Sequence, residues 1–505
     1  MRKTSNLRTR LLALVLIMVM CLPLFITTSK AFAEEKKIIV FSVDDYIDES
    51  IFDTFKEQTG IEVEYNTFAT NEEMYNELIK NPKACDLMCP SEYMIMKLMS
   101  EDLIRSFETP QNFTDYGSKY IKDVFKGLQI EGLNETTIPI MSQDGATSYA
   151  VGYMWGTIGL IYNMNATLED GTKVTPETFK SWSSIWQHFD GRVTIKDSIR
   201  DSYFIALAYV YQDELLAAKE KYALDGNSAL YNATISEIFN RTDKESIDKV
   251  EKALLDLKEK LYGFEVDAGK ADILTGKIDV NFAWSGDAVY SIYQGLYNEE
   301  TEEVLENPVY LGYAVPEEGS NVWFDGYVMT KNANYDNAIQ FLDFLCDPEI
   351  AVLNMDYTGY TSCIAGDEVF QYVVDSYNDG EGEGTDVDLA YFFDETDTTG
   401  KYVINVSDFS LPMFSAQYPT KDIIERCAVM RNFTGEELEN VNNMWKRVKL
   451  ITLSDAVIVL ILVAIVLVIA GVVIYKYRET IFAKWYNKPP KEKKAKNKII
   501  KKENI

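Results

Sequence analysis

The sequence predicts an α/β protein whose core is a largely parallel sheet. Three observations support this fold class. The chain of 505 residues is 47% hydrophobic and 25% charged, which is the composition of a globular protein. Its length exceeds that of one ordinary domain and predicts two or three compact units. From residue 37 onward, segments patterned as strands alternate with segments of helical periodicity, as in parallel sheets covered by helices.

The first element is a secretory signal peptide, predicted for residues 1–33. Basic residues precede an apolar run from Leu11 to about Thr27, and a small-x-small cleavage site ends at Ala33. An uncleaved anchor and lipidation at Cys21 are the alternatives. Five cysteines remain after cleavage, and their spacing does not suit a metal site. We therefore expect buried free thiols, and a single disulfide is the alternative.

The body opens with two strand and helix pairs. An apolar run that ends in an acidic turn (36–48) precedes SIFDTFKEQTG (50–60), a helical pattern closed by Gly60. IEVEYNTF (61–68) alternates as a strand does, and NEEMYNELIK (71–80) has the character of a capping box and helix. Residues 85–104 predict a short strand, a proline turn and another helix. In such sheets, ligands bind beyond the carboxyl ends of the strands.

The second half of the body predicts strands around a helical region. Three segments have strand character, namely 147–163, 277–289 and 307–329. Residues 200–262 are largely helical and include KESIDKVEKALLDLKEKL, whose leucines and charges fit a surface helix. The acidic stretch 375–400 is expected to be a solvated loop, because Tyr377 stands where a calcium loop needs a ligand.

The C-terminal part predicts a membrane anchor. Residues 456–475 are 20 uncharged and almost wholly apolar residues, and a helix of that length spans about 30 Å, the hydrocarbon thickness of a bilayer. The tail, residues 476–505, carries a net charge of +8 and is predicted to be cytoplasmic. Lys446, Arg447 and Lys449 on the other side weaken this signal slightly. The body is therefore expected to be extracellular or periplasmic.

Charge and residue content exclude several function classes. The chain carries 79 acidic and 49 basic side chains, and the region between its basic ends has a net charge of −43. This balance argues against a nucleic-acid partner and favours attraction of cations. His188 is the only histidine, and no Walker, GxSxG or HExxH pattern occurs. We therefore predict no enzyme activity, no cofactor and no metal site.

Several short motifs carry a resemblance. After the strand and acidic turn that lead to Tyr46, they are DLMCPSEYM, YMWGTIGLIYN, SWSSIW, GKIDVNFAWSGD, VWFDG and TGYT. Each is weak alone, but their order resembles the solute-binding proteins of polyamine (spermidine/putrescine) ABC importers over residues 36–447. The resemblance implies a two-lobed periplasmic-binding-protein-like fold with crossover hinge strands, and an ABC permease and ATPase as partners. Lobe 1 would comprise 36–156 and 324–366, and lobe 2 would comprise 157–323 and 367–447.

The resemblance also implies a ligand site of aromatic walls and carboxylates. The family's Trp-x-x-Tyr motif here begins with Val43, so a tryptophan is missing and the sequence does not choose between putrescine and spermidine. The positions that match the family's ligand-binding residues are Asp45, Tyr46, Ser91, Tyr93, Asp201, Trp284, Asp287, Trp323, Asp325 and Tyr360. Three other tryptophans, Trp155, Trp182 and Trp186, are assigned to packing.

The residue types of this set suit a polyamine on physical grounds. A polyamine is a flexible hydrocarbon chain with protonated nitrogens, so it needs flat apolar walls and an anion for each nitrogen. Asp325 lies within VWFDGYVM (322–329), where no neighbour offers a positive charge, so its partner is expected from outside the chain. The alternatives are a receptor for a sugar, ferric ion or thiamine, a tethered polyamine sensor, and a glycosidase with two carboxylates.

Overall fold

The computed structural model describes residues 36–126, 140–142, 146–298, 300–301, 303–378, 384–450 and 455–486. The chain forms two compact units, Met1–Val448 and Lys449–Ile505. The first unit contains all the residues expected to bind a ligand. The predicted signal peptide, residues 1–33, lies outside the described residues.

One mixed sheet organises the first unit. Its strands run in the order β2 (Glu62–Phe68), β1 (Lys37–Val43), β3 (Leu87–Met88), β12 (Val322–Thr330), β7 (Ala150–Asn163), β10 (Val280–Trp284), β8 (Val193–Lys196) and β9 (Gly263–Glu265). β1 pairs in parallel with β2 and β3, and β8 pairs in parallel with β9 and β10. The α/β prediction is confirmed, with parallel strands at both ends of the sheet.

Two antiparallel strands, β7 and β12, join the ends of this sheet. β12 pairs with β3 and with the first part of β7. The last part of β7 pairs instead with β10 and β11 (Leu311–Ala314). Two short strands complete the sheet, β4 (Ile104–Arg105) beside β12 and β13 (Thr361–Ser362) beside β7. β7 and β12 are thus the crossover strands of a two-lobed fold.

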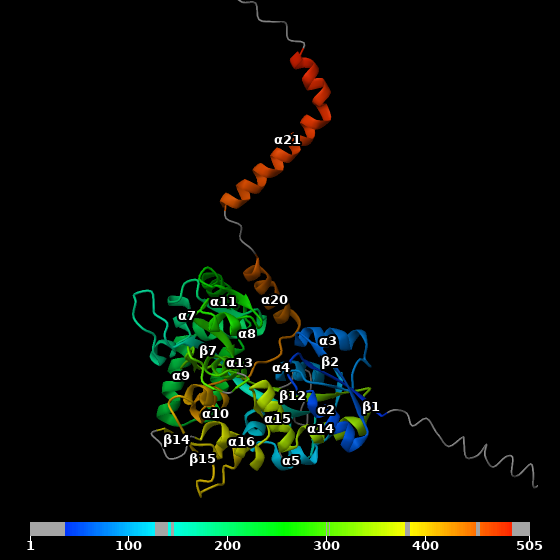
Figure 1. Ribbon diagram of the computed structural model, residues 1–505, viewed down its shortest axis with the longest axis vertical. Coiled ribbons are helices and arrows are strands. Elements are labelled where there is room, and N and C mark those ends of the chain that lie inside the picture. The colour runs from blue at the N-terminus through cyan, green and yellow to red at the C-terminus, as the bar shows by residue number, and fades with distance from the viewer. Residues whose placement is uncertain are drawn as a thin grey trace, which may run out of the picture. The chain divides into compact units, whose positions relative to one another are not determined.

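The helices of the first unit lie mostly between consecutive strands. They are α2 (Ser50–Thr59), α3 (Asn71–Lys80), α4 (Glu92–Ser100), α5 (Gln111–Tyr116), α6 (Lys119–Val124), α7 (Ser183–Gln187), α8 (Ile199–Val210), α9 (Gln212–Asp225), α10 (Ser228–Phe239), α11 (Lys244–Lys258), α12 (Gly269–Leu274), α13 (Ser285–Leu296), α14 (Tyr335–Leu345), α15 (Pro348–Thr358), α16 (Asp367–Tyr377), α17 (Ala390–Phe393), α18 (Leu411–Gln417), α19 (Lys421–Glu425) and α20 (Gly435–Lys449). Two small ladders, β5 (Phe107–Glu108) with β6 (Thr147–Ser148) and β14 (Thr385–Asp388) with β15 (Val403–Val406), lie outside the main sheet. Figure 1 shows β1, β2, α2 and α3 on one side of this unit and α7, α8 and α11 on the other.

Local signals explain why the first helices form where the sequence predicts them. Gly60 ends α2 in the left-handed conformation, with φ of 70°. The Thr70 hydroxyl accepts a hydrogen bond from the Glu73 amide at 3.1 Å, and the Glu73 carboxylate accepts one from the Ala69 amide at 3.0 Å. These contacts satisfy amide groups at the start of α3, as capping residues do.

Two predicted segments differ from the structure. The expected strand 277–289 ends at Trp284, and α13 begins at Ser285 with Asp287 in its first turn. The stretch 375–400, expected to be a solvated loop, contains the end of α16 as well as β14 and α17. Leu389 and Phe392 of this stretch are almost completely buried, and these apolar anchors order it.

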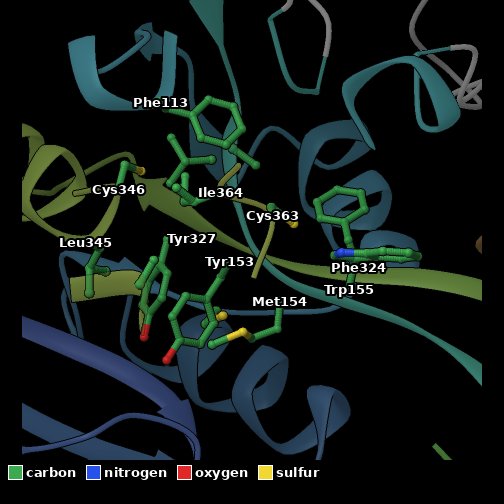
Figure 2. Packing of buried hydrophobic residues seen from close by; sticks show 14 of the residues in the cluster. Phe113, Tyr153, Met154, Trp155, Phe324, Tyr327, Leu345, Cys346, Cys363 and Ile364 are labelled. Atoms are coloured by element: carbon green, nitrogen blue, oxygen red, sulfur yellow. The ribbon is translucent and has the colours of Figure 1, made fainter. Parts of the chain in front are cut away.

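The buried side chains fall into separate core clusters. The first cluster contains the residues around β1, β3 and the first part of β7, and Figure 2 shows part of it, with Phe324 of β12 beside Trp155 of β7. The second cluster contains the end of β7 with α7, α8, α10 and α11, and a smaller third cluster lies around α13. Trp155, Trp182 and Trp186 are buried in these clusters, which confirms their assignment to packing.

The lobe boundaries drawn from the resemblance remain predictions. The core clusters divide the chain differently after residue 367, because residues from Val369 to Cys427 pack mainly in the first cluster. Residues from Ala428 to Val448 pack in the second. The five cysteines of the body, Cys85, Cys89, Cys346, Cys363 and Cys427, are buried and free, as expected.

The second unit contains α21 (Asp455–Tyr486). Among the residues that the structure describes, no helix reaches the length and apolar content needed to cross a membrane. Most of the predicted cytoplasmic tail, residues 487–505, lies outside the described residues.

Candidate functional site

Asp325 lies where the first two core clusters meet. On β12 it follows Trp323, which packs in the second cluster, and Phe324, which packs in the first. The pairing of β12 with β7 shifts register between Asp325 and Gly326, so the strand is irregular there. A Cβ atom at Gly326 would lie 2.8 Å from the Val151 carbonyl oxygen, so the close approach of the two strands requires glycine.

The carboxylate of Asp325 is only partly satisfied. The Tyr46 hydroxyl donates a hydrogen bond to its Oδ2 atom at 2.7 Å. Tyr46 follows β1, and Ser91, which follows β3, forms a backbone bridge with Asp325. The Oδ1 atom is shielded from solvent and has no hydrogen-bond partner among the described residues. A buried acceptor left in this state costs about 1–3 kcal/mol, so the site favours a donor from outside.

The acids around Asp325 destabilise each other's charge. Burial raises the pKa of Asp325 to about 6 and Asp201 adds to the rise, while the hydroxyl groups of Ser91 and Tyr46 partly offset it. Burial, and then Asp325, raise the pKa of the Glu92 carboxyl well above its usual range. Glu92 is 1% exposed, and within the described part of the chain its Oε2 atom lacks a hydrogen-bond partner. A cation bound here would relieve the repulsion between these groups.

Three aromatic rings lie beside this carboxylate. The rings of Tyr46 and Tyr360 meet edge to face with centroids 5.5 Å apart, and those of Trp323 and Tyr360 have the same separation. Tyr360 packs against both the first and the second core cluster. Its ring lies so close to Gly286 that a Cβ atom there would be 2.3 Å from it. These rings provide the apolar walls next to Asp325.

Asp287 already has a cation from the chain itself. The Lys196 ammonium lies 3.0 Å from Asp287 Oδ2 and 3.3 Å from Glu265 Oε1, and it donates a hydrogen bond to the Val266 carbonyl at 2.8 Å. It also lies 4.5 Å from the centre of the Trp284 ring. Burial alone would lower the pKa of Lys196, but Asp287 and Glu265 outweigh burial and hold that pKa above its usual value. Tyr360 Oη donates to Asp287 Oδ1 at 3.2 Å and links the two groups of residues.

Asp201 and Tyr93 lie next to a second internal cation. The Arg200 guanidinium lies 5.0 Å from the centre of the Tyr93 ring and 3.7 Å from that of Phe433. Burial raises the pKa of Asp201, although Ser198 and the two cationic side chains, Lys196 and Arg200, oppose the rise. Since Arg200 is on α8 and Tyr93 is on α4, this contact also brings the two sides of the unit together.

The structure brings together most, but not all, of the predicted ligand residues. Tyr46, Ser91, Asp201, Trp323, Asp325 and Tyr360 lie around one junction, and Tyr93, Trp284 and Asp287 border it through their contacts with Arg200 or Lys196. Asp45 is exposed in the turn after β1, with φ of 52°. Tyr357 of α15 lies near this turn, and its pKa is raised first by burial and then by the charge of Asp45.

Four charged residues of the site were not among the predicted ligand residues. Glu92, Lys196, Arg200 and Glu265 are each at most 8% exposed. Glu92 belongs to the PSEY motif and could have been noticed as an acid beside Ser91. Lys196 is the last residue of the apolar strand VTIK. A lysine in a buried strand needs a partner, so its position there was the signal that could have indicated an internal ion pair.

Comparisons with known proteins give concordant results. A family model described as "Bacterial extracellular solute-binding protein" matches residues 50–366. The spermidine/putrescine-binding periplasmic protein of Escherichia coli (strain K12) is 24% identical over 337 residues, which cover 66% of this chain and 79% of that protein. The putrescine-binding periplasmic protein PotF of the same organism is 23% identical over 341 residues, covering 65% and 78%.

A solved structure has a similar fold. It is the spermidine/putrescine ABC transporter substrate-binding protein PotD from Streptococcus pneumoniae strain Canada MDR_19A. The TM-score is 0.53 at 20% identity, and the match covers 82% of this chain and 98% of the other. This likeness supports the two-lobed architecture.

Proposed function

The chain belongs to the bacterial extracellular solute-binding proteins, and from that premise we propose that it binds a polyamine, putrescine or spermidine, between its two lobes. The family is one of binding proteins, which favours a binding role over catalysis. Relatives named for binding spermidine and putrescine are similar to this chain over about two thirds of its length. Their names suggest the ligand, and the residues around Asp325 give a physical reason for it.

The observation that carries the proposal is the unsatisfied Asp325 carboxylate between aromatic rings. Asp325 Oδ1 and Glu92 Oε2 are buried acceptors without hydrogen-bond partners in the described residues. A protonated amine supplies both a positive charge and up to three donors, so it meets this need directly. The rings of Tyr46, Trp323 and Tyr360 suit the methylene chain that joins one amine to the next. Closure of the lobes excludes water and strengthens these ion pairs.

The proposal extends to transport and to the membrane. The loaded protein delivers its ligand to an ABC permease driven by a cytoplasmic ATPase. On the sequence alone, residues 456–475 are the proposed membrane anchor, which would place the body outside and the tail, 476–505, inside. The support is the uncharged apolar run followed by a tail with a net charge of +8. A tethered receptor stays close to its permease, which raises its effective concentration there.

Substitution of Asp325 tests the proposed function. Asp325→Asn keeps the shape of the side chain but removes the charge that attracts the ammonium. We expect calorimetric affinity for putrescine or spermidine to weaken by about 1.5–3 kcal/mol, roughly tenfold to 150-fold. Asp45→Asn, an exposed aspartate in the turn after β1, is the matched control and should bind as the wild type does. Unchanged affinity in Asp325→Asn would reject the assigned role of Asp325, and the absence of polyamine binding by the wild type would reject the function.

A further inference from the structure

Lys196 is surrounded as the ammonium group of a bound amine would be. Its side chain is 2% exposed, and its nitrogen has oxygen neighbours from Asp287, Glu265 and the Val266 carbonyl at 3.0, 3.3 and 2.8 Å. The Val266 carbonyl and Asp287 Oδ2 accept hydrogen bonds from this ammonium. Glu265 Oε1 is an ion-pair neighbour that has no hydrogen-bond partner among the described residues. The ring of Trp284 lies 4.5 Å away and adds a cation–π contact. This cage contains two acids, a ring and the Lys196 ammonium. A second ammonium, that of Lys270, lies 3.8 Å from Asp287 Oδ1 and pairs with Asp267 at 2.7 Å.

We propose that Lys196 is the chain's own occupant of the amine subsite formed by Asp287, Glu265 and Trp284, so that the ligand is a short diamine and not a triamine. The inference rests on the proposed function, since it assigns the ligand length within the same site. A ligand ammonium that approached Asp287 would meet the Lys196 ammonium, and like charges at contact distance repel each other strongly.

The acids that remain for a ligand lie on the Asp325 side. Asp325 and Glu92 each have a buried oxygen without a hydrogen-bond partner among the residues described. Asp201 is close enough to Asp325 to raise the pKa of that carboxyl. Arg200 offsets part of this negative charge from its place over the Tyr93 ring. Two ammonium groups of a ligand therefore have Asp325, Glu92 and Asp201 to bind, although Lys196 and Arg200 already stabilise part of the charge of Asp201. A third ammonium group would need the subsite that Lys196 fills.

The test compares putrescine and spermidine on the purified full-length chain by isothermal titration calorimetry. The wild type should bind putrescine more tightly than spermidine. Lys196→Met removes this cation and frees Asp287 Oδ2 for a ligand ammonium, while Lys270 stays 3.8 Å from Asp287 Oδ1. We expect the affinity for spermidine to rise relative to that for putrescine by about tenfold or more, the effect of one added charged hydrogen bond. Lys196→Arg keeps a cation in the cage and should retain the preference of the wild type.

A second buried lysine provides the matched control. Lys122 is 3% exposed, donates to the Phe113 carbonyl at 2.9 Å and lies 4.7 Å from the centre of the Phe113 ring. Lys122→Met therefore also removes a buried ammonium from beside a ring, but one that donates its hydrogen bond to a backbone carbonyl and not to an acid of the ligand set. It should leave the ratio of the two affinities unchanged, whatever it does to thermal stability.

Removal of Lys196 leaves Glu265 without its cation and leaves Asp287 with the more distant Lys270, so the variant is expected to lose stability. Lys196→Met combined with Glu265→Gln removes one of those acids with the lysine and keeps Asp287 available, so the same shift toward spermidine is expected from it. A wild type that prefers spermidine would overturn the inference. An unchanged ratio in a folded variant, single or double, would do so as well. In both cases the proposed function would stand. If neither the wild type nor any variant bound a polyamine, both the inference about Lys196 and the proposed function would be overturned.

Discussion

Two carboxylates of the site differ in what neutralises them. Asp287 Oδ2 lies 3.0 Å from the Lys196 ammonium. Asp325 Oδ2 accepts a hydrogen bond from the Tyr46 hydroxyl at 2.7 Å, and Asp325 Oδ1 has no hydrogen-bond partner among the described residues. A hydroxyl group satisfies one lone pair but supplies no charge. Burial therefore leaves the pKa of Asp325 at about 6. A cation bound at Asp325 would consequently be lost in mild acid.

The raised pKa of Asp325 predicts how affinity varies with pH. An exposed aspartate titrates near 3.9, so in the ligand-free chain protonation of Asp325 favours folding below about pH 4, and this contribution is lost as pH rises through 6. Bound ammonium favours the ionised form instead. Polyamine affinity should therefore be constant above about pH 7 and fall below pH 6, approaching tenfold per pH unit.

The measurement is a calorimetric series from about pH 5 to pH 7.5. The titratable groups that interact with Asp325 are those of Tyr46, Glu92, Asp201, Tyr153, Tyr360, Cys89 and Cys363. Glu92, whose pKa is also raised, adds to the fall in affinity. Asp325→Asn should flatten the profile as well as weaken binding. A wild-type affinity that stayed level through pH 6 would show that Asp325 does not bind the ligand in its ionised form.

The sequence could identify Asp325 but not the role of Lys196. Asp325 is conspicuous in the local sequence, because a lone acid lies among apolar and aromatic residues. Lys196 depends on acids that are distant along the chain, since Asp287 is 91 residues away. No local pattern indicates such a pair. From the sequence, none of the four predicted acids therefore had a visible cation partner within the chain. Tertiary contacts alone show that one of them is already neutralised.

At the scale of elements, the start of α13 determines how close the two sides of the site come. Strand β10 ends at Trp284, and α13 begins at once with Ser285, Gly286 and Asp287. Because Gly286 has no side chain, the Tyr360 ring lies directly on this first turn. The contact allows Tyr360 Oη to donate to Asp287 Oδ1. The expected strand 277–289 missed this transition, because short apolar runs do not distinguish strand from helix.

Gly286→Ala should disturb this contact. The added methyl group would lie 2.3 Å from the Tyr360 ring, and overpacking of this kind typically costs about 1–3 kcal/mol. We expect a lower melting temperature and weaker polyamine binding, because Tyr360 must move away from Asp287 and Trp323. Gly263→Ala on β9 is the control, since a Cβ atom there meets nothing within 4 Å. If Gly286→Ala matched this control in both measurements, the contact between Tyr360 and α13 would not matter for the site.

At the scale of the whole molecule, charge is separated along the chain. The basic N-terminal 33 residues and C-terminal tail flank a region with a net charge of −43. An acidic body attracts polyamines at long range, and this attraction weakens as salt screens it. A tail of +8 suits the anionic inner surface of a membrane.

Truncation tests the proposed anchor. The full-length chain should stay with the membrane fraction after a high-salt wash, because an apolar span is held by the hydrocarbon core and not by charge. A chain that ends at residue 450 should be released and still bind polyamine. A chain that ends at residue 478 lacks most of the tail but keeps the apolar run, so it should remain in the membrane. Release of the full-length chain by salt would contradict a membrane-spanning anchor.

Strand β7 links the unfolding of the two halves of the body. Strand β7 is a single continuous segment, and it contributes residues to the first core cluster up to Trp155 and to the second from Ile158. If either half melted, the other would lose a central strand of its own sheet. The halves therefore share one thermal transition, and damage to either core lowers the heat tolerance of both.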